Sequence, residues 1–322
     1  MPLFTMRRVA LRLHPELDDN ALAKVCKQLK SPFFRKLARI QVPAVERVIR
    51  IAGDNWDRRT RRLSALAAAS ADSKLAEVWL QAQPHCADAL LLHSWANLIA
   101  GRCKESSIKR DSAIENCYQA AEMQPEDPAP WIVLLAILRD LRSSHHEVVP
   151  VWNRLVSLDP WNREGHLQML GYLSPAECGS HAMVLDFVDQ RCAMMPPDAP
   201  AAGLPLIAAV KRHHASTSRS NLEALLAHRW WQQPSHAGLL DKAVALWPDP
   251  GFLRHAAALA DLNVLAYALV HARRLPDAAE VFQAIGSVVT PWPWLIDGDP
   301  LQRFAYWRAR ALSQNPSTVV RR

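Results

Sequence analysis

Three prolines in the middle of the chain divide it at a nearly constant interval. Pro125, Pro160 and Pro196 lie 35 and 36 residues apart, and each is followed by the start of another helical segment. A fixed spacing in this range is typical of α-helical repeat proteins, in which each helix pair buries its apolar face against its neighbours. The period therefore predicts an array of helices that works by holding something, and it leaves open what is held.

The composition favours an all-α chain in the cytoplasm. Half of the 322 residues are hydrophobic, glycine is scarce at 10, and the 23 prolines tend to stand between helical runs, whose interiors exclude proline. Alternating runs of strand length are nearly absent. The six cysteines form no CxxC pair, the N-terminus lacks the apolar core of a signal peptide, and the longest apolar runs are far short of a membrane span. We expect reduced thiols, a cytoplasmic location and no membrane partner.

The positive charge is concentrated at the N-terminal end. Residues 1–62 hold 15 Lys and Arg against 6 Asp and Glu, a net charge of +9, whereas the other 260 residues carry 23 against 25, a net of −2. The candidate basic patch consists of Arg35, Lys36, Arg39, Arg58, Arg59, Arg61 and Arg62. Such a patch binds phosphates or an acidic protein surface, although a solvated helix face is the commoner outcome. No aromatic residues are interleaved with these arginines, so base stacking gains no support.

Helix signals divide the chain into three expected parts: a basic N-terminal helical cap over 1–55, helical repeats over 56–290, and a C-terminal capping helix and tail over 291–322. Asp18 or Asp19 is placed to cap the first helix, and Pro32 and Pro43 suit the first turns of the next two. Asp299 is placed as the cap of the last helix. Helices are expected at 19–30, 32–40, 43–52, 56–70, 72–83, 87–100, 111–123, 181–194, 203–214, 219–231, 236–246 and 300–314, with a polar insertion at 101–110.

Two helix pairs carry a family resemblance. Its positions are Trp131, Leu134, Leu138, Trp152, Leu155 and Pro160 in one pair, and Leu262, Leu265, Ala266, Leu269, Ala278, Phe282 and Ile285 in the other. On these residues the chain resembles the tetratricopeptide repeat family, as a divergent member over about 56–290, because the glycine at the eighth position is missing. The central portion also resembles uncharacterised helical-repeat proteins of actinobacteria. The resemblance implies a right-handed α-solenoid of helical hairpins and implies no activity.

In that family the first helix of each pair lines the concave side. The resemblance places there a candidate partner groove of Ile132, Arg139, Asp140, Glu164, Gln168 and Gly171. These residues mix charge with apolar area, which suits a peptide or a protein helix. The first hypothesis is therefore a non-catalytic adaptor, scaffold or regulator. The second is a nucleic-acid-associated protein that uses the basic N-terminal face, and the third, well behind, is an enzyme whose repeats enclose a pocket.

One short segment invites a catalytic interpretation. Cys178 and His181 lie three residues apart across Gly179, and a nucleophilic thiol needs a base within hydrogen-bond reach. The simpler interpretation is a loop before a helix at 181–194, with Ser180 as its cap. We expect no catalytic residues.

Two histidine pairs are candidate metal ligands. His145-His146 and His213-His214 each stand without the further ligands that a zinc site needs. No nucleotide, hydrolase or calcium-binding motif occurs. We expect neither a metal nor a cofactor.

Twelve tryptophans are the remaining unusual feature. Those on helical core positions, expected to be packing anchors, are Trp79, Trp95, Trp131 and Trp152. Those that do not follow the repeat are Trp230, Trp231, Trp292 and Trp294. The second group either packs under the C-terminal cap, which their large area favours, or forms an exposed contact for a homo-oligomer.

Overall fold

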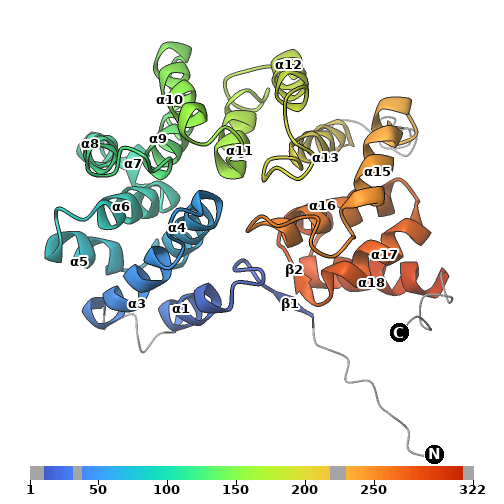
Figure 1. Ribbon diagram of the computed structural model, residues 1–322, viewed down its shortest axis with the longest axis horizontal. Helices are drawn as coiled ribbons and strands as arrows, with labels where there is room; N and C mark the ends of the chain where they lie inside the picture. The colour runs from blue at the N-terminus through green and yellow to red at the C-terminus, as the bar shows by residue number, and fades with distance from the viewer. Residues whose placement is uncertain (1–10, 32–37, 218–229, 315–322) are drawn as a thin grey trace, which may run out of the picture. The chain divides into compact units, whose positions relative to one another are not determined.

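The computed structural model of the protein describes residues 11–31, 38–217 and 230–314. Within these ranges, helices form nearly all of the regular secondary structure (Figure 1), so the prediction of an all-α chain is confirmed. No helix in these ranges is both long and apolar enough to cross a membrane.

The contacts divide the chain into two compact units. Residues 19–204 form the central unit, whereas residues 1–18 and 205–322 form the terminal unit. This division differs from the expected boundaries at 55 and 290, because the beginning of the chain packs with its end. The strand β1 (Arg12–Leu13) pairs in parallel with β2 (Val288–Val289).

The central unit is a succession of helices. They are α1 (Asn20–Lys30), α3 (Ala38–Arg50), α4 (Trp56–Ser70), α5 (Leu75–Ala82), α6 (Ala87–Ile99), α7 (Arg102–Glu105), α8 (Ser107–Met123), α9 (Ala129–Asp140), α10 (His145–Leu158), α11 (Arg163–Tyr172) and α12 (His181–Cys192). Several begin at side-chain caps, as the sequence predicts. Asp19 accepts the backbone N–H of Leu22 at 3.0 Å, and Ser180 accepts that of Met183 at 3.2 Å.

Four helices of the central unit pack together through α4 and α9. The helix α4 contacts α6, α9 and α11, and α9 contacts α6 and α11. Apolar residues of α9 supply much of this packing, since Ile132 to Ile137 are all at most 4% exposed. The arrangement leaves the C-terminal turns of α6 and α9 and one side of α11 around a common depression.

One expectation for the N-terminal helices is corrected. Pro43 was expected in the first turn of a helix over 43–52, but α3 begins at Ala38 and runs through it. A proline inside a helix loses one backbone hydrogen bond and costs about 3 kcal/mol. Burial of Val45, Val48 and Ile49 on the opposite face offsets this cost. The expected helix at 219–231 and most of that at 32–40 lie outside the described residues.

The expected polar insertion at 101–110 is also partly helical. It contains the short helix α7 and the first turn of α8, whose cap Ser106 accepts the N–H of Lys109 at 3.4 Å. This segment brings Lys104 to the end of α9, where its ammonium lies 2.7 Å from a carboxylate oxygen of Asp140.

The terminal unit has its own aromatic core. Its helices are α13 (Leu204–Thr217), α15 (Pro234–Leu246), α16 (Ala258–His271), α17 (Leu275–Ile285), the short 3₁₀ helix η1 (Trp294–Asp297) and α18 (Pro300–Gln314). Trp294 is fully buried, with ring centroids 5.4 Å from both Tyr267 and Phe304. Trp231 is 1% exposed. These two tryptophans are therefore core residues and offer no surface for self-association.

Candidate partner-binding groove

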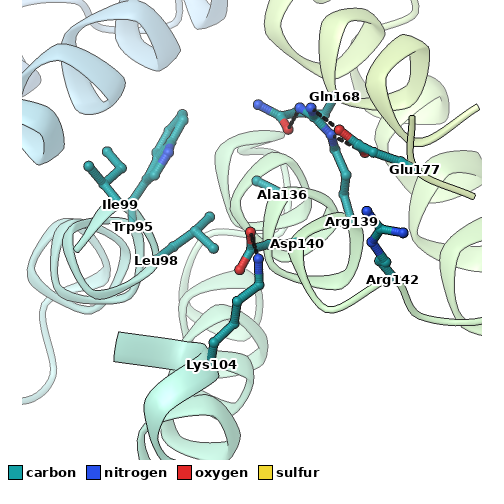
Figure 2. A pocket seen from close by; sticks show the side chains of 10 residues that line it. All are labelled: Trp95, Leu98, Ile99, Lys104, Ala136, Arg139, Asp140, Arg142, Gln168 and Glu177. Carbon is teal, nitrogen blue, oxygen red and sulfur yellow. Dashed lines mark hydrogen bonds and ion pairs between the residues drawn. The ribbon is translucent and has the colours of Figure 1, made fainter. Parts of the chain in front are cut away.

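A groove of about 450 Å³ opens between the inner helices of the central unit (Figure 2). The residues that line it, and that define the groove, are Trp95, Leu98, Ile99, Lys104, Ala136, Arg139, Asp140, Arg142, Gln168 and Glu177. These residues come from α6, α7, α9, α11 and the turns that follow α9 and α11. Segments that are distant in sequence thus share one depression.

One wall of the groove is apolar. The last turns of α6 present Trp95, Leu98 and Ile99, which Figure 2 shows across from Arg139 and Glu177. Trp95 is almost buried and forms the inner part of this wall, whereas Ile99 remains 45% exposed. A half-exposed isoleucine beside a depression is surface that an apolar side chain of a partner can cover.

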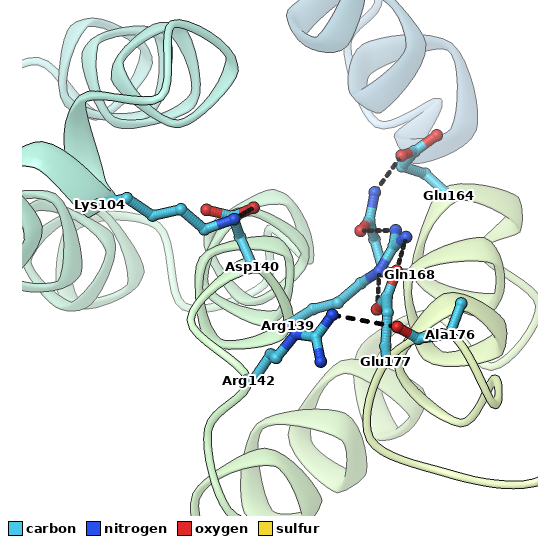
Figure 3. Close-up of polar contacts among 8 residues, drawn as sticks. All are labelled: Lys104, Arg139, Asp140, Arg142, Glu164, Gln168, Ala176 and Glu177. Atoms are coloured by element: carbon cyan, nitrogen blue, oxygen red, sulfur yellow. Dashed lines mark hydrogen bonds and ion pairs between the residues drawn. The ribbon is translucent and has the colours of Figure 1, made fainter.

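The other wall is held by a bidentate ion pair. Arg139 donates from Nε and Nη2 to the two carboxylate oxygens of Glu177, at 2.7 and 2.5 Å (Figure 3). Its Nη1 donates to Gln168 at 2.8 Å, and Gln168 in turn donates to Glu164 at 2.7 Å. The hydrogen bonds to Glu177 raise the pKa of the Arg139 guanidinium. Bidentate pairs fix geometry as well as charge, so this wall is preorganised.

Gly171 makes room for the ion pair. A Cβ atom at this position of α11 would lie 2.3 Å from Cζ of Arg139. Any other residue would therefore displace the guanidinium from its place over the helix. The absence of a side chain at 171 is what lets Arg139 reach Glu177 and Gln168 together.

The rim of the groove carries two further cations. Lys104 pairs with Asp140 at 2.7 Å, and Arg142 donates to the backbone carbonyl of Ala176 at 3.1 Å. Arg142 follows α9 in a left-handed conformation with φ of 54°, which closes the helix and turns the chain towards α10. It is an exposed residue.

Most of the groove residues expected from sequence do meet. Arg139, Asp140 and Gln168 line the groove, Glu164 holds Gln168, and Gly171 lies under Arg139. The exception is Ile132, which is fully buried in α9 and cannot touch a partner.

The sequence reasoning missed the apolar wall of α6 and three charged members, Lys104, Arg142 and Glu177. Lys104 and Glu177 pair with Asp140 and Arg139, which lie 36 and 38 residues away. No spacing within one helix pair signals such contacts.

The candidate basic patch is divided by the fold. Arg59 is 6% exposed and points inward, where its guanidinium donates to Asp127 at 2.8 Å, to Asp88 at 2.5 Å and to Gln124 at 3.1 Å. The attraction of the two carboxylates outweighs desolvation and raises the pKa of this guanidinium. Arg59 therefore links α4 to α6 and to the segment before α9.

Arg62 is also internal. It is 5% exposed and donates to Asp19 and to the carbonyl of Val48, both at 2.7 Å. Burial raises the pKa of Asp19, but the hydrogen bonds from Arg62 and from the backbone of Leu22 outweigh this effect and leave that pKa below its usual value. Arg62 thus joins the start of α1 and the end of α3 to α4.

The rest of the patch is mixed. Arg39 and Arg58 are exposed and Arg61 is half-buried. Arg35 and Lys36 lie outside the described residues.

The segment with Cys178 and His181 is a tight turn. The backbone of Cys178 donates to Tyr172 at 3.0 Å, and that of Gly179 donates to Ser174 at 3.1 Å. A Cβ at Gly179 would lie 2.1 Å from the carbonyl oxygen of Leu173, so the turn requires glycine. The expected loop and Ser180 cap are confirmed, and α12 ends at Cys192, two residues earlier than expected.

The histidine pairs show no common site. His145 packs edge-on against Tyr172, and His213 lies among the rings of Trp230, Trp231 and His271. Within the described ranges, no three His, Cys, Asp or Glu side chains are grouped so as to hold a metal ion.

No protein-family model and no curated protein sequence matches this chain. A function for the chain is therefore inferred from the groove geometry and the residue chemistry alone.

Proposed function

We propose that the protein is a non-catalytic interaction module that holds a peptide segment of a partner protein in the groove. The observation that carries this proposal is the pairing of an apolar wall on α6 with a preorganised polar wall on α9 and α11. Peptide recognition combines apolar pockets with fixed polar groups in this way. The charged residues of the polar wall hold one another in place, which suits a binding surface.

The architecture that we propose with this function is a divergent tetratricopeptide-like array, a right-handed α-solenoid whose first helices line the groove. The supporting observation is that α4 contacts α6, α9 and α11, and that α9 contacts α6 and α11. An adaptor or regulator in a cytoplasmic complex is the role that such an array fits.

The proposal is tested by selecting binders from a random peptide library displayed on phage, with the full chain as bait. Peptides selected on the wild type are then titrated against Ile99→Glu, which places a charge on the apolar wall. The matched control is Ile108→Glu, because Ile108 is 80% exposed on α8 and does not line the groove. We expect about tenfold or greater loss of affinity for Ile99→Glu and no change for Ile108→Glu. No selected peptide, or equal affinity for the two variants, would contradict the proposal.

A second candidate function is nucleic-acid association through α3. Arg39, Arg47 and Arg50 are all exposed, and their spacings of eight and three residues place them on one helix face. Glu46 offsets part of this charge through an ion pair with Arg50 at 3.7 Å. Affinity for duplex DNA or RNA that falls steeply with salt, and that is lost on replacing Arg39 and Arg47 by Glu, would favour this function. No salt-dependent binding would remove it.

A further inference from the structure

The charges of the groove do not balance among themselves. Its lining has three cations and two carboxylates. Arg139 is paired with Glu177 and donates to Gln168, and Lys104 pairs with Asp140. The remaining cation is Arg142, which has no carboxylate within ion-pair distance anywhere in the described part of the chain, and whose guanidinium donates to the carbonyl of Ala176. One positive charge on the rim is therefore uncompensated.

The backbone holds this charge in a defined place. Arg142 has φ of 54°, and the following residue, Ser143, donates its N–H to the carbonyl of Leu138 at 2.9 Å. This is the closing hydrogen bond of a helix end of the Schellman type. A left-handed conformation is uncommon for arginine, and the role usually falls to glycine. Arg142 thus occupies a position whose backbone conformation favours glycine.

The uncompensated charge and the apolar wall belong to the same small depression. Figure 2 shows Arg142 and Glu177 across the groove from Leu98 and Ile99. A volume of about 450 Å³ accommodates a few side chains of a ligand rather than a folded domain. A ligand that fits both features has an apolar side chain and an anionic group close together.

We infer that the groove selects peptide segments in which an aspartate or glutamate stands next to a bulky apolar residue, with the carboxylate on Arg142 and the apolar side chain on Leu98 and Ile99. This inference rests on the proposed function and adds the class of partner to it. The carboxylate source is a protein segment, because the apolar wall across the groove from Arg142 has no counterpart in a free phosphate or a nucleic-acid backbone. Arginine is suited to the role since its planar fork matches a carboxylate.

The chain provides a matched control for Arg142. Arg273 follows α16 in the same left-handed conformation, with φ of 60°, is exposed, and belongs to the terminal unit. Arg142→Glu and Arg273→Glu change the net charge of the protein equally and place the same residue in the same backbone conformation. Only the first lies in the groove. Arg142→Gly removes the charge with a residue that the backbone accommodates readily.

The experiment uses the phage-selected peptides and the full-length variants. We expect the selected sequences to be enriched in Asp or Glu beside Leu, Ile or Phe. Arg142→Glu should weaken them about fivefold to tenfold and Arg142→Gly about threefold, as expected for an exposed ion pair, whereas Arg273→Glu should leave affinity unchanged. Replacing the peptide carboxylates by amides should give a similar loss on the wild type and none on Arg142→Gly.

Each other outcome overturns the inference in a recognisable way. Peptides that lose affinity with Ile99→Glu but show no acidic enrichment and no response to Arg142→Glu would leave the groove as a binding site and refute the carboxylate. Equal losses for Arg142→Glu and Arg273→Glu would assign the effect to overall charge. Competition by duplex DNA that Arg142→Glu abolishes would show that the anion is a phosphate.

Discussion

Two helical hairpins, α9–α10 in the central unit and α16–α17 in the terminal unit, have the same backbone turn after their first helix. Arg142 and Arg273 are both left-handed, with φ of 54° and 60°. In both hairpins the next residue, Ser143 or Arg274, donates its N–H at 2.9 Å to a carbonyl five residues earlier. The two backbones can therefore be aligned residue by residue, with a constant offset of 131.

The aligned side chains make different contacts in the two hairpins. Asp140, which pairs with Lys104 beside the groove, corresponds to His271, which pairs with Asp297 at 3.0 Å. The buried Ile132 corresponds to Asn263, whose amide is equally buried. The first helix of the hairpin α9–α10 ends in charged side chains around a depression. The first helix of the hairpin α16–α17 packs into a core of aromatic and amide side chains. The two hairpins thus differ in the side chains at the end of the first helix, although the backbone turn is the same.

The largest expected effect tests the claim that buried ion pairs hold the central unit together. Arg59→Ala leaves Asp127 and Asp88 without their cation, and losing one partner of a buried pair costs about 3 to 5 kcal/mol. Urea denaturation followed by circular dichroism measures the loss. The control is Arg58→Ala on the exposed side of α4, expected to change stability by less than about 0.5 kcal/mol. Similar small effects for both variants would mean that the network is not what holds these helices.

The next prediction tests the buried amide of Asn263 in the terminal unit. Asn263 accepts from Trp294 Nε1 at 3.0 Å and from the backbone of Thr290 at 3.3 Å. Asn263→Leu leaves both donors buried without an acceptor, which should cost about 2 to 4 kcal/mol. Asn153→Leu, on the exposed side of α10, is the control and should be nearly neutral. A neutral Asn263→Leu would show that the terminal core tolerates a purely apolar residue here.

A third prediction concerns the pH dependence of stability that a buried histidine of the central unit, His166, confers. His271 faces the carboxylate of Asp297, whereas His166 is 1% exposed, with Nδ1 2.8 Å from the carbonyl of Asn162 and with no partner for Nε2 among the described residues. Burial lowers the pKa of His166 from 6.5 to about 4, and the nearby Arg191 acts in the same direction. The unfolded chain then binds this proton first, so the contribution to stability is complete above pH 6.5 and is lost as the pH falls towards 4.

The expected size of that loss is about 3 kcal/mol across this interval. The free energy of unfolding should therefore fall between pH 6.5 and 4 in the wild type and fall less in His166→Phe. His146→Phe, at an exposed position, should keep the wild-type slope. Equal slopes for the two variants would contradict the low pKa of His166.

The smallest expected effect concerns the polar wall of the groove. Gly171→Ala places a Cβ 2.3 Å from the Arg139 guanidinium and should release it from Glu177 and Gln168. A half-buried bidentate pair is worth about 1 kcal/mol, so stability should fall only slightly. Peptide affinity should fall more, because the wall is no longer preorganised. Unchanged affinity would mean that Arg139 is not part of the binding surface.

Local features of the fold were predictable from sequence. Asp19, Ser180 and Asp299 cap helices as expected, since a cap depends on a side chain and a backbone amide only three residues apart. The bounds of α4 agree with the expected helix at 56–70. The course of α3 through Pro43 was not predictable in this way, because tertiary burial overrides the preference of a single residue.

The groove was predictable only in part. Arg139 and Gln168 face it because helical spacing fixes which side of a first helix is inward. Glu177 precedes Cys178 in a segment that the sequence predicts to be a loop, and its ion pair with Arg139 depends on how separate helices pack. Arg59 looked like surface charge for the same reason, since its carboxylate partners lie 29 and 68 residues away.

Hydrogen exchange of the full-length protein, with and without a selected peptide, tests the central claim most directly. Binding in the groove should slow exchange at the end of α6 and at the turns after α9 and α11, and should leave the turn after α16 unchanged. This result would show that the same backbone turn serves binding in one hairpin and core packing in the other. Protection confined to α3 or to the terminal unit, with the groove unaffected, would contradict the account.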